Sequence, residues 1–119
     1  MFDHVTGAVN PEVVAYWHDH WDLAHTVEEH WGERGAMLRG RIHLFVGTAD
    51  TFYLDGSAHL FEARLQKLGA EPHFEYVPGR SHFDVYKVGE DRNALFDRIG
   101  REMWATARGG EWHGDAAAK

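Results

Sequence analysis

Two side chains with complementary acid–base chemistry, Asp50 and His82, each follow a short apolar segment of the sequence. Asp50 comes three residues after the segment 41–47, and His82 comes shortly after residues 72–77. Ligands of open parallel sheets bind outside the carboxyl ends of the strands, which is where both side chains would lie. A carboxylate bonded to one imidazole nitrogen fixes the tautomer, so that the other nitrogen can act as a general base. The sequence therefore predicts an acid–histidine pair, with Asp50 and His82 as the candidate catalytic residues.

The segment between these two residues has the pattern needed to bring them to one edge of a sheet. Residues 41–47 are almost continuously apolar, as in strands that are covered on both faces. An amphipathic helix is predicted over Ser57–Leu68, and Gly69 stands where many helices end in a left-handed conformation. Two strands that are joined through a helix run parallel. We therefore expect an α/β fold with two adjacent parallel strands, at about residues 41–47 and 72–77.

Helices are expected on both sides of this unit. Asn10 and Asp22 are of the residue types that cap helices, and each precedes a helical pattern. The second of these helices is expected to end at about Trp31, because Gly32 and Gly35 follow it. The chain is thus predicted to be one partial domain, 1–119, composed of a helical lead-in (1–40), a strand–helix–strand unit with acid and histidine loops (41–86), a C-terminal helix (91–108) and a tail (109–119).

Composition narrows the possible classes of function. The 119 residues allow one domain at most, and the formal net charge of -7 does not favour nucleic acid or an anionic membrane as a partner. No apolar run approaches the ~20 residues that span a bilayer, and no signal peptide is expected. The absence of cysteine excludes disulfides, thiolate metal sites and cysteine nucleophiles, and leaves the compartment open. No cofactor is expected.

Aromatic and apolar residues are numerous for so short a chain. Five Trp, seven Phe and four Tyr need more cover than two strands and a few helices offer. In the C-terminal helix, Leu95, Ile99 and Met103 share one face, and His43 on the first strand is expected to be a buried histidine. We therefore expect exposed apolar surface that is covered by another chain, by the remainder of the same protein or by self-association.

Two strings in the sequence resemble the loops of a known enzyme family. Gly47–Gly56 is similar to the acid loop of α/β-hydrolase esterases of the esterase D, or S-formylglutathione hydrolase-like, group, and Pro78–Phe83 resembles their histidine loop. The likeness is clearest over residues 38–86 and extends more weakly to Trp17–Trp31. It implies the C-terminal fragment of an α/β-hydrolase fold that acts on a small ester, with Asp50 as triad acid and His82 as triad base. It also implies that Trp21 and His20 border the substrate.

The sequence departs from this family at the nucleophile. The Gly-x-Ser-x-Gly elbow does not occur, and the only serines are Ser57 and Ser81. Ser57 is expected to begin a helix, and Ser81 adjoins His82 on an extended loop, where neighbouring side chains point apart. Asp55 is an alternative acid, although a role as helix cap suits it better. We therefore expect a hydrolase portion that lacks its nucleophile and is inactive alone.

Two other classes of function stay open. The chain could be a non-catalytic interaction module that keeps a hydrolase-like shape without the chemistry. It could also be a histidine-rich metal-binding domain, because imidazoles and carboxylates that suit zinc are close together in the lead-in. The candidate ligands are His18, His20, His25 and His30, with Asp19 or Asp22. His18 and His20 are two residues apart and do not share a helix face, so no specific metal site is predicted.

Overall fold

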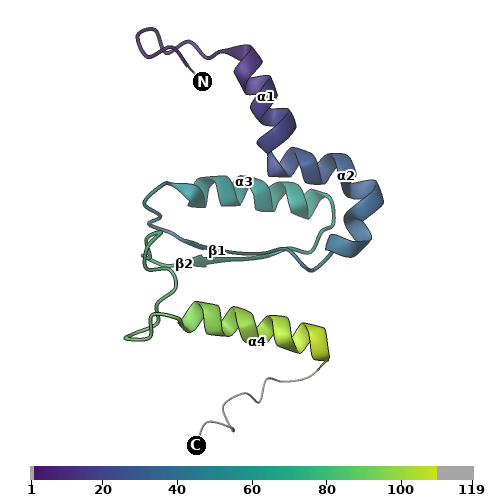
Figure 1. The fold of residues 1–119 in the computed structure, drawn as a ribbon, viewed down its shortest axis with the longest axis vertical. Helices are drawn as coiled ribbons and strands as arrows, with labels where there is room; N and C mark the ends of the chain where they lie inside the picture. The colour runs from purple at the N-terminus through teal and green to yellow at the C-terminus, as the bar shows by residue number, and fades with distance from the viewer. Residues whose placement is uncertain (1, 110–119) are drawn as a thin grey trace, which may run out of the picture.

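The computed structural model describes residues 2–109, which form a mixed α/β fold with four helices and two parallel strands (Figure 1). The predicted tail (109–119) lies almost wholly outside the described residues. In chain order the elements are α1 (Pro11–Trp21), α2 (Leu23–Leu38), β1 (His43–Gly47), α3 (Leu54–Lys67), β2 (His73–Val77) and α4 (Ala94–Arg108). Over these residues, no helix is both long and apolar enough to cross a bilayer.

The two strands are neighbours and run parallel, as the sequence predicted. Their register pairs His43 with His73 at one end and Gly47 with Val77 at the other. Each strand is slightly shorter than predicted. Helix α3, which connects the strands, lies over one face of the sheet, and α4 lies over the opposite face (Figure 1). The carboxyl ends of β1 and β2 therefore meet at one edge, from which the acid and histidine loops emerge.

The two predicted N-terminal caps of the lead-in are confirmed. The side-chain oxygen of Asn10 accepts the amide hydrogens of Glu12 and Val13, at 3.0 and 3.2 Å. The Oδ1 atom of Asp22 accepts those of Ala24 and His25 in the same way, at 2.9 and 3.2 Å. These bonds satisfy amides that have no partner within the first turn of a helix. Asp22 therefore lies between α1 and α2, and the chain changes direction at this residue.

Helix α2 does not end near Trp31, so that prediction is wrong. It continues through Gly32 and Gly35 to Leu38. Gly35 is buried, and a Cβ atom there would lie 2.8 Å from Cε2 of the Trp31 indole. The missing side chain at Gly35 thus makes room for the ring one turn earlier. Packing of the indole offsets the cost of glycine within a helix, which is about 1 kcal/mol relative to alanine.

Helix α3 begins three residues before the predicted Ser57, because an acceptor outside the helix satisfies its first amide. Oδ1 of Asp50 accepts the amide hydrogens of Phe52, at 2.8 Å, and Leu54, at 3.3 Å. Asp55 lies inside the first turn and does not cap the helix, which corrects the expected role of this residue. The predicted end is confirmed, since Gly69 follows Leu68 with a φ of 68°.

Helix α4 places charged side chains over the sheet, in contrast to the predicted apolar face. The Arg98 guanidinium binds the Glu75 carboxylate at 2.7 Å and lies 4.9 Å from the centroid of the Phe45 ring. Of the predicted face only its first residue is buried, and Met103 is 68% exposed. His43 is exposed rather than buried, with Nδ1 3.9 Å from Glu102. Ion pairs therefore form between α4 and the sheet, where apolar packing was expected.

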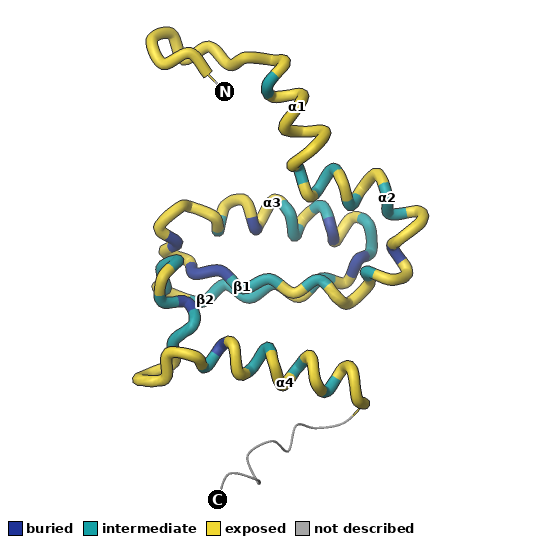
Figure 2. Tube along the Cα trace, viewed as in Figure 1, coloured by how far each residue is buried: buried dark blue, intermediate teal, exposed yellow. Residues whose placement is uncertain are grey.

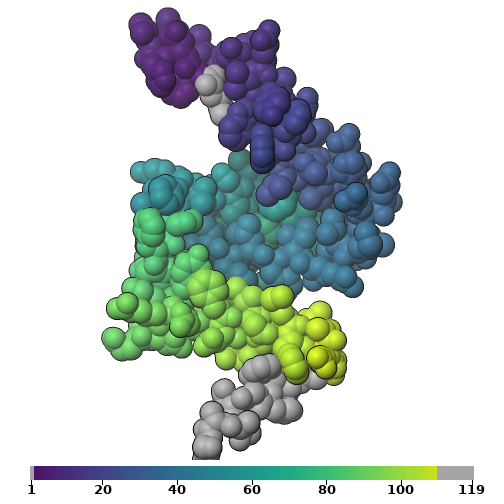
Figure 3. Space-filling view, viewed as in Figure 1, coloured from purple at the N-terminus to yellow at the C-terminus, as the bar shows by residue number. Residues whose placement is uncertain are grey.

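The buried core of the described chain is small and lies around β1 and α3 (Figure 2). Its apolar members are Val46, Ala58, Leu65, Ala70, Val85 and Leu95. Helix α1 and the residues before it extend away from this core (Figure 3). Large apolar side chains are exposed on every helix, as expected from the composition; examples are Trp17, Trp21, Leu23, Leu60 and Met103.

Candidate functional site

Asp50 and His82 meet at the carboxyl ends of the two strands. Asp50 belongs to the acid loop (residues 48–53), which follows β1, and His82 belongs to the histidine loop (residues 78–83), which follows β2. The distance between Oδ2 of Asp50 and Nδ1 of His82 is 3.0 Å. The structure therefore brings together the two residues that the sequence singled out, in a direct hydrogen bond.

Backbone hydrogen bonds tie the two loops to each other. The Thr48 amide donates to the Val77 carbonyl, and the Ala49 amide donates to the Arg80 carbonyl, both at 3.0 Å. The Thr48 hydroxyl accepts the Gly79 amide hydrogen at 2.8 Å. These bonds extend the pairing of the strands beyond the sheet itself. The spacing of the acid and the imidazole is thus fixed by the loops and does not depend on the two side chains alone.

Asp50 is held as a buried carboxylate. Its side chain is 2% exposed, and its two oxygens accept three hydrogen bonds, from Phe52, Leu54 and His82. Burial by itself would raise the pKa of Asp50, but the amides and the imidazole together hold that pKa below its usual value. Because an ionised carboxylate only accepts hydrogen bonds, Nδ1 of His82 carries the proton in this contact.

His82 has one occupied and one available nitrogen. Its side chain is 40% exposed, and within residues 2–109 its Nε2 atom has no hydrogen-bond partner. The ring of Phe52 meets the imidazole edge to face at 5.0 Å, and the ring of Phe83 does so at 5.5 Å. The aromatic contacts and the carboxylate restrict rotation of the ring. A fixed imidazole with an unprotonated Nε2 can accept a proton from a hydroxyl group or a water molecule.

Comparisons with models of protein families, with curated proteins and with solved structures gave no match. The likeness to α/β-hydrolase esterases therefore stays a prediction.

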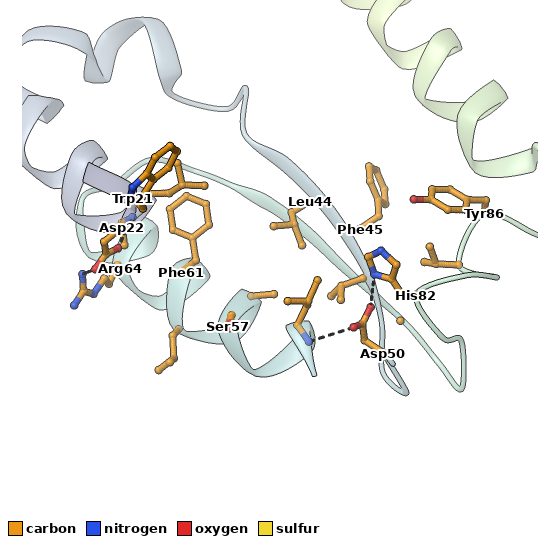
Figure 4. A pocket seen from close by; sticks show the side chains of 18 residues that line it. Trp21, Asp22, Leu44, Phe45, Asp50, Ser57, Phe61, Arg64, His82 and Tyr86 are labelled. Atoms are coloured by element: carbon orange, nitrogen blue, oxygen red, sulfur yellow. Dashed lines mark hydrogen bonds and ion pairs between the residues drawn. The ribbon is translucent and has the colours of Figure 1, made fainter. Parts of the chain in front are cut away.

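A pocket with a volume of about 600 Å³ extends from the Asp50–His82 pair along β1 and α3 (Figure 4). Its wall is mostly apolar, with side chains from β1, from α3 and from the segment after the histidine loop; examples are Leu44, Phe45, Phe61, Val85 and Tyr86. A volume of this size suits a small organic ligand. The pair therefore lies at one end of a space that is able to hold a substrate.

The far end of the pocket is formed by residues around the junction of α1 and α2. Trp21, a predicted substrate residue, lines the pocket there, beside Asp22 and Arg64 (Figure 4). His20 is not among the lining residues: it is exposed, and its Nδ1 lies 2.8 Å from the Tyr16 carbonyl oxygen. Arg64, which lies 3.7 Å from the Asp22 carboxylate, was missed because its position on α3 gave no signal in the sequence.

Neither serine forms a triad with His82 in this structure. The Ser81 hydroxyl donates to Oδ1 of Asp84 at 2.7 Å, and the Ser81 amide donates to the same oxygen. These two bonds, the side-chain bond first, lower the pKa of Asp84. Ser57 lines the pocket from within α3, rather than beginning that helix, and stands apart from His82 in Figure 4. Because the sequence has no other serine, it does not itself supply a serine nucleophile for His82.

We expect Asp50 to stabilise the fold at neutral pH and to lose this effect in acid. The folded-state pKa is lowered, so the stabilisation is fully present above the unfolded-state pKa of about 3.9 and disappears as the pH falls through the folded-state pKa. Urea denaturation of the chain and of Asp50→Asn, at about pH 7 and about pH 3, measures this. The free energies of unfolding should differ more at the higher pH. An equal difference at both pH values would contradict the lowered pKa.

Proposed function

We propose that this chain supplies the acid and the general base of a serine ester hydrolase whose nucleophile is carried elsewhere. The observation that carries the proposal is the 3.0 Å bond between Asp50 Oδ2 and His82 Nδ1, at the carboxyl ends of two parallel strands. The available Nε2 atom and the apolar pocket beside it support the same role. The likeness of both loops to those of esterases agrees with it.

The chemistry follows from the positions of the two nitrogens of His82. Nε2 takes the proton of a serine hydroxyl while the serine oxygen attacks the ester carbonyl. The same proton then passes to the departing alkoxide as the acyl-enzyme forms, and water repeats the sequence to release the acid. Asp50 holds Nδ1–H and stabilises the imidazolium that exists between the two transfers. The apolar wall of the pocket would hold the acyl or alcohol group of a small ester.

The decisive experiment combines the chain with a polypeptide that carries Gly-x-Ser-x-Gly, encoded beside it, and measures hydrolysis of a short p-nitrophenyl ester. Alone, the chain should hydrolyse this ester no faster than its His82→Ala variant. In the complex, Asp50→Asn should lower kcat by about 10⁴-fold, because asparagine favours the wrong imidazole tautomer. The matched control is Asp55→Asn, which changes the other carboxylate near the acid loop and should leave kcat unchanged. A complex that is inactive, or indifferent to His82→Ala, overturns the proposal.

The exposed apolar side chains favour a second candidate, a non-catalytic interaction module. Trp21, Leu23 and Leu60 all line the pocket and are largely exposed. Such a surface suits the remainder of a hydrolase, but it also suits a second copy of the chain. Analytical ultracentrifugation distinguishes the two. A defined oligomer that excludes small esters from the pocket favours the module, whereas a monomer that assembles with the nucleophile-bearing polypeptide favours the enzyme.

A further inference from the structure

The junction of α1 and α2 gathers three metal-binding side chains from two helices. His18 and Asp19 lie in the last turns of α1, and His25 lies in the first turn of α2, after the change of direction at Asp22. One donor atom from each of the three lies within 4.8 Å of the other two. The two histidines are seven residues apart and in different helices, so helical spacing alone does not bring them together.

The contacts within this cluster already have dimensions close to those of a coordination shell. Nδ1 of His18 lies 3.0 Å from Oδ1 of Asp19, and the rings of His18 and His25 have centroids 4.0 Å apart. Ligands on a tetrahedral ion with bonds of about 2.0–2.1 Å lie roughly 3.4 Å from one another. Rotation of these side chains, of which two are exposed and His25 is half-buried, would bring the three donors to this spacing.

His20, the other histidine of α1, lies outside this cluster. His20 lies on α1 with its ring stacked on Tyr16 at 4.2 Å and its Nδ1 bonded to the Tyr16 carbonyl. Glu29, one turn after His25, has a carboxylate oxygen 3.9 Å from His25 Nε2. Within this histidine-rich segment, the donor atoms of His18, Asp19 and His25 therefore lie together. The Glu29 carboxylate lies beside His25.

We propose that His18, Asp19 and His25 bind a divalent transition-metal ion, with the fourth position left to water or to Glu29. Two imidazoles and a carboxylate suit zinc and its neighbours in the first transition row, and do not suit Mg²⁺ or Ca²⁺. A bound ion joins α1 to α2 on either side of Trp21 and Asp22, which line the far end of the pocket. Metal binding therefore fixes the angle between the helices and the position of that end. This inference is independent of the proposed hydrolase activity.

Isothermal titration of the untagged chain with ZnCl₂ tests the site. We expect one site per chain, with an affinity at least about ten-fold weaker in His18→Ala and in His25→Ala, because each removes one of three ligands. Zinc should also raise the melting temperature of the chain and should not do so in these variants. MgCl₂ at the same concentrations should give no heat of binding.

His20→Ala is the matched control, because it removes a histidine of the same helix that lies outside the cluster. Its affinity for zinc should match that of the unchanged chain. Circular dichroism of each variant without metal identifies any loss of helix, and Asp19→Asn supplies a third ligand change that keeps the shape of the side chain. A chain that binds no zinc, or a His20→Ala variant that loses as much affinity as His18→Ala, overturns the proposal.

Discussion

Replacing Gly47 with alanine is expected to separate the acid and histidine loops and to destabilise the chain by about 3 kcal/mol or more, at the upper end of overpacking effects. Gly47 is the last residue of β1 and is buried. A Cβ atom there would overlap the carbonyl carbon and oxygen of Arg80 and would lie 3.2 Å from the Arg80 Cβ. The obstacle is backbone, and the same carbonyl accepts the Ala49 amide hydrogen that ties the loops. Relief of the overlap therefore has to move one loop away from the other.

Urea denaturation measures the loss of stability, and the proton resonance of His82 Nδ1–H reports on the pair itself. The control is Gly56→Ala, the same chemical change in the first turns of α3, where a new Cβ would meet nothing within 4 Å. Alanine should stabilise that position by up to about 1 kcal/mol, because it has the higher helix propensity. The two substitutions are thus expected to have opposite signs. A Gly47→Ala chain as stable as the original would show that the loops do not approach as described.

The second large effect is expected at Leu65, where alanine should lower the free energy of unfolding by about 2–5 kcal/mol. Leu65 is 0% exposed and is the largest fully buried side chain in the described part of the chain. It points from α3 into the small core above the sheet. Since small domains are marginally stable, a loss of this size is expected to leave a large unfolded fraction at room temperature.

Leu60→Ala makes the same substitution on the same helix, at a side chain that is 72% exposed. Exposed positions change stability by only about 0.5 kcal/mol in either direction, so this variant should unfold near the original midpoint. Thermal or urea unfolding followed by circular dichroism compares the pair directly. Similar losses in both variants would place the core elsewhere than between α3 and β1.

Features set by local chemistry were predictable from the sequence. Asn10 and Asp22 cap helices through their own side chains, and Gly69 ends α3 in a conformation that glycine adopts without strain. The parallel pair followed from two apolar segments joined by an amphipathic helix. These signals depend only on a few neighbouring residues, and tertiary packing did not override them.

Features that depend on distant partners were not predictable. Helix α2 passes through Gly35 because the Trp31 ring packs there, and α3 begins early because Asp50 caps it from the loop. Helix α4 turns Arg98 toward the sheet because Glu75 and Phe45 on the strands receive it. In each case the contacting group belongs to another turn, loop or strand. The hydrophobic pattern of the segment itself therefore did not predict the helix bounds or the buried face.

The candidate site likewise has a part that the sequence predicted and parts that it did not. The Asp50–His82 bond was predicted because each residue lies in the loop that follows a strand, and parallel strands bring their carboxyl ends together. The contribution of Arg64 to the pocket required the packing of α3 against the junction of α1 and α2. The convergence of His18 with His25 likewise required the change of direction at Asp22.

The backbone bonds between the acid and histidine loops also affect how the chain opens. Helix α1 has no buried residue, so we expect it to open locally and its amides to exchange hydrogen with solvent at those moments. The amides of Thr48 and Ala49 are hydrogen-bonded across the loops, so we expect them to exchange more slowly than the amides at the ends of α1. The carboxylate and the imidazole are therefore expected to remain aligned when α1 opens locally.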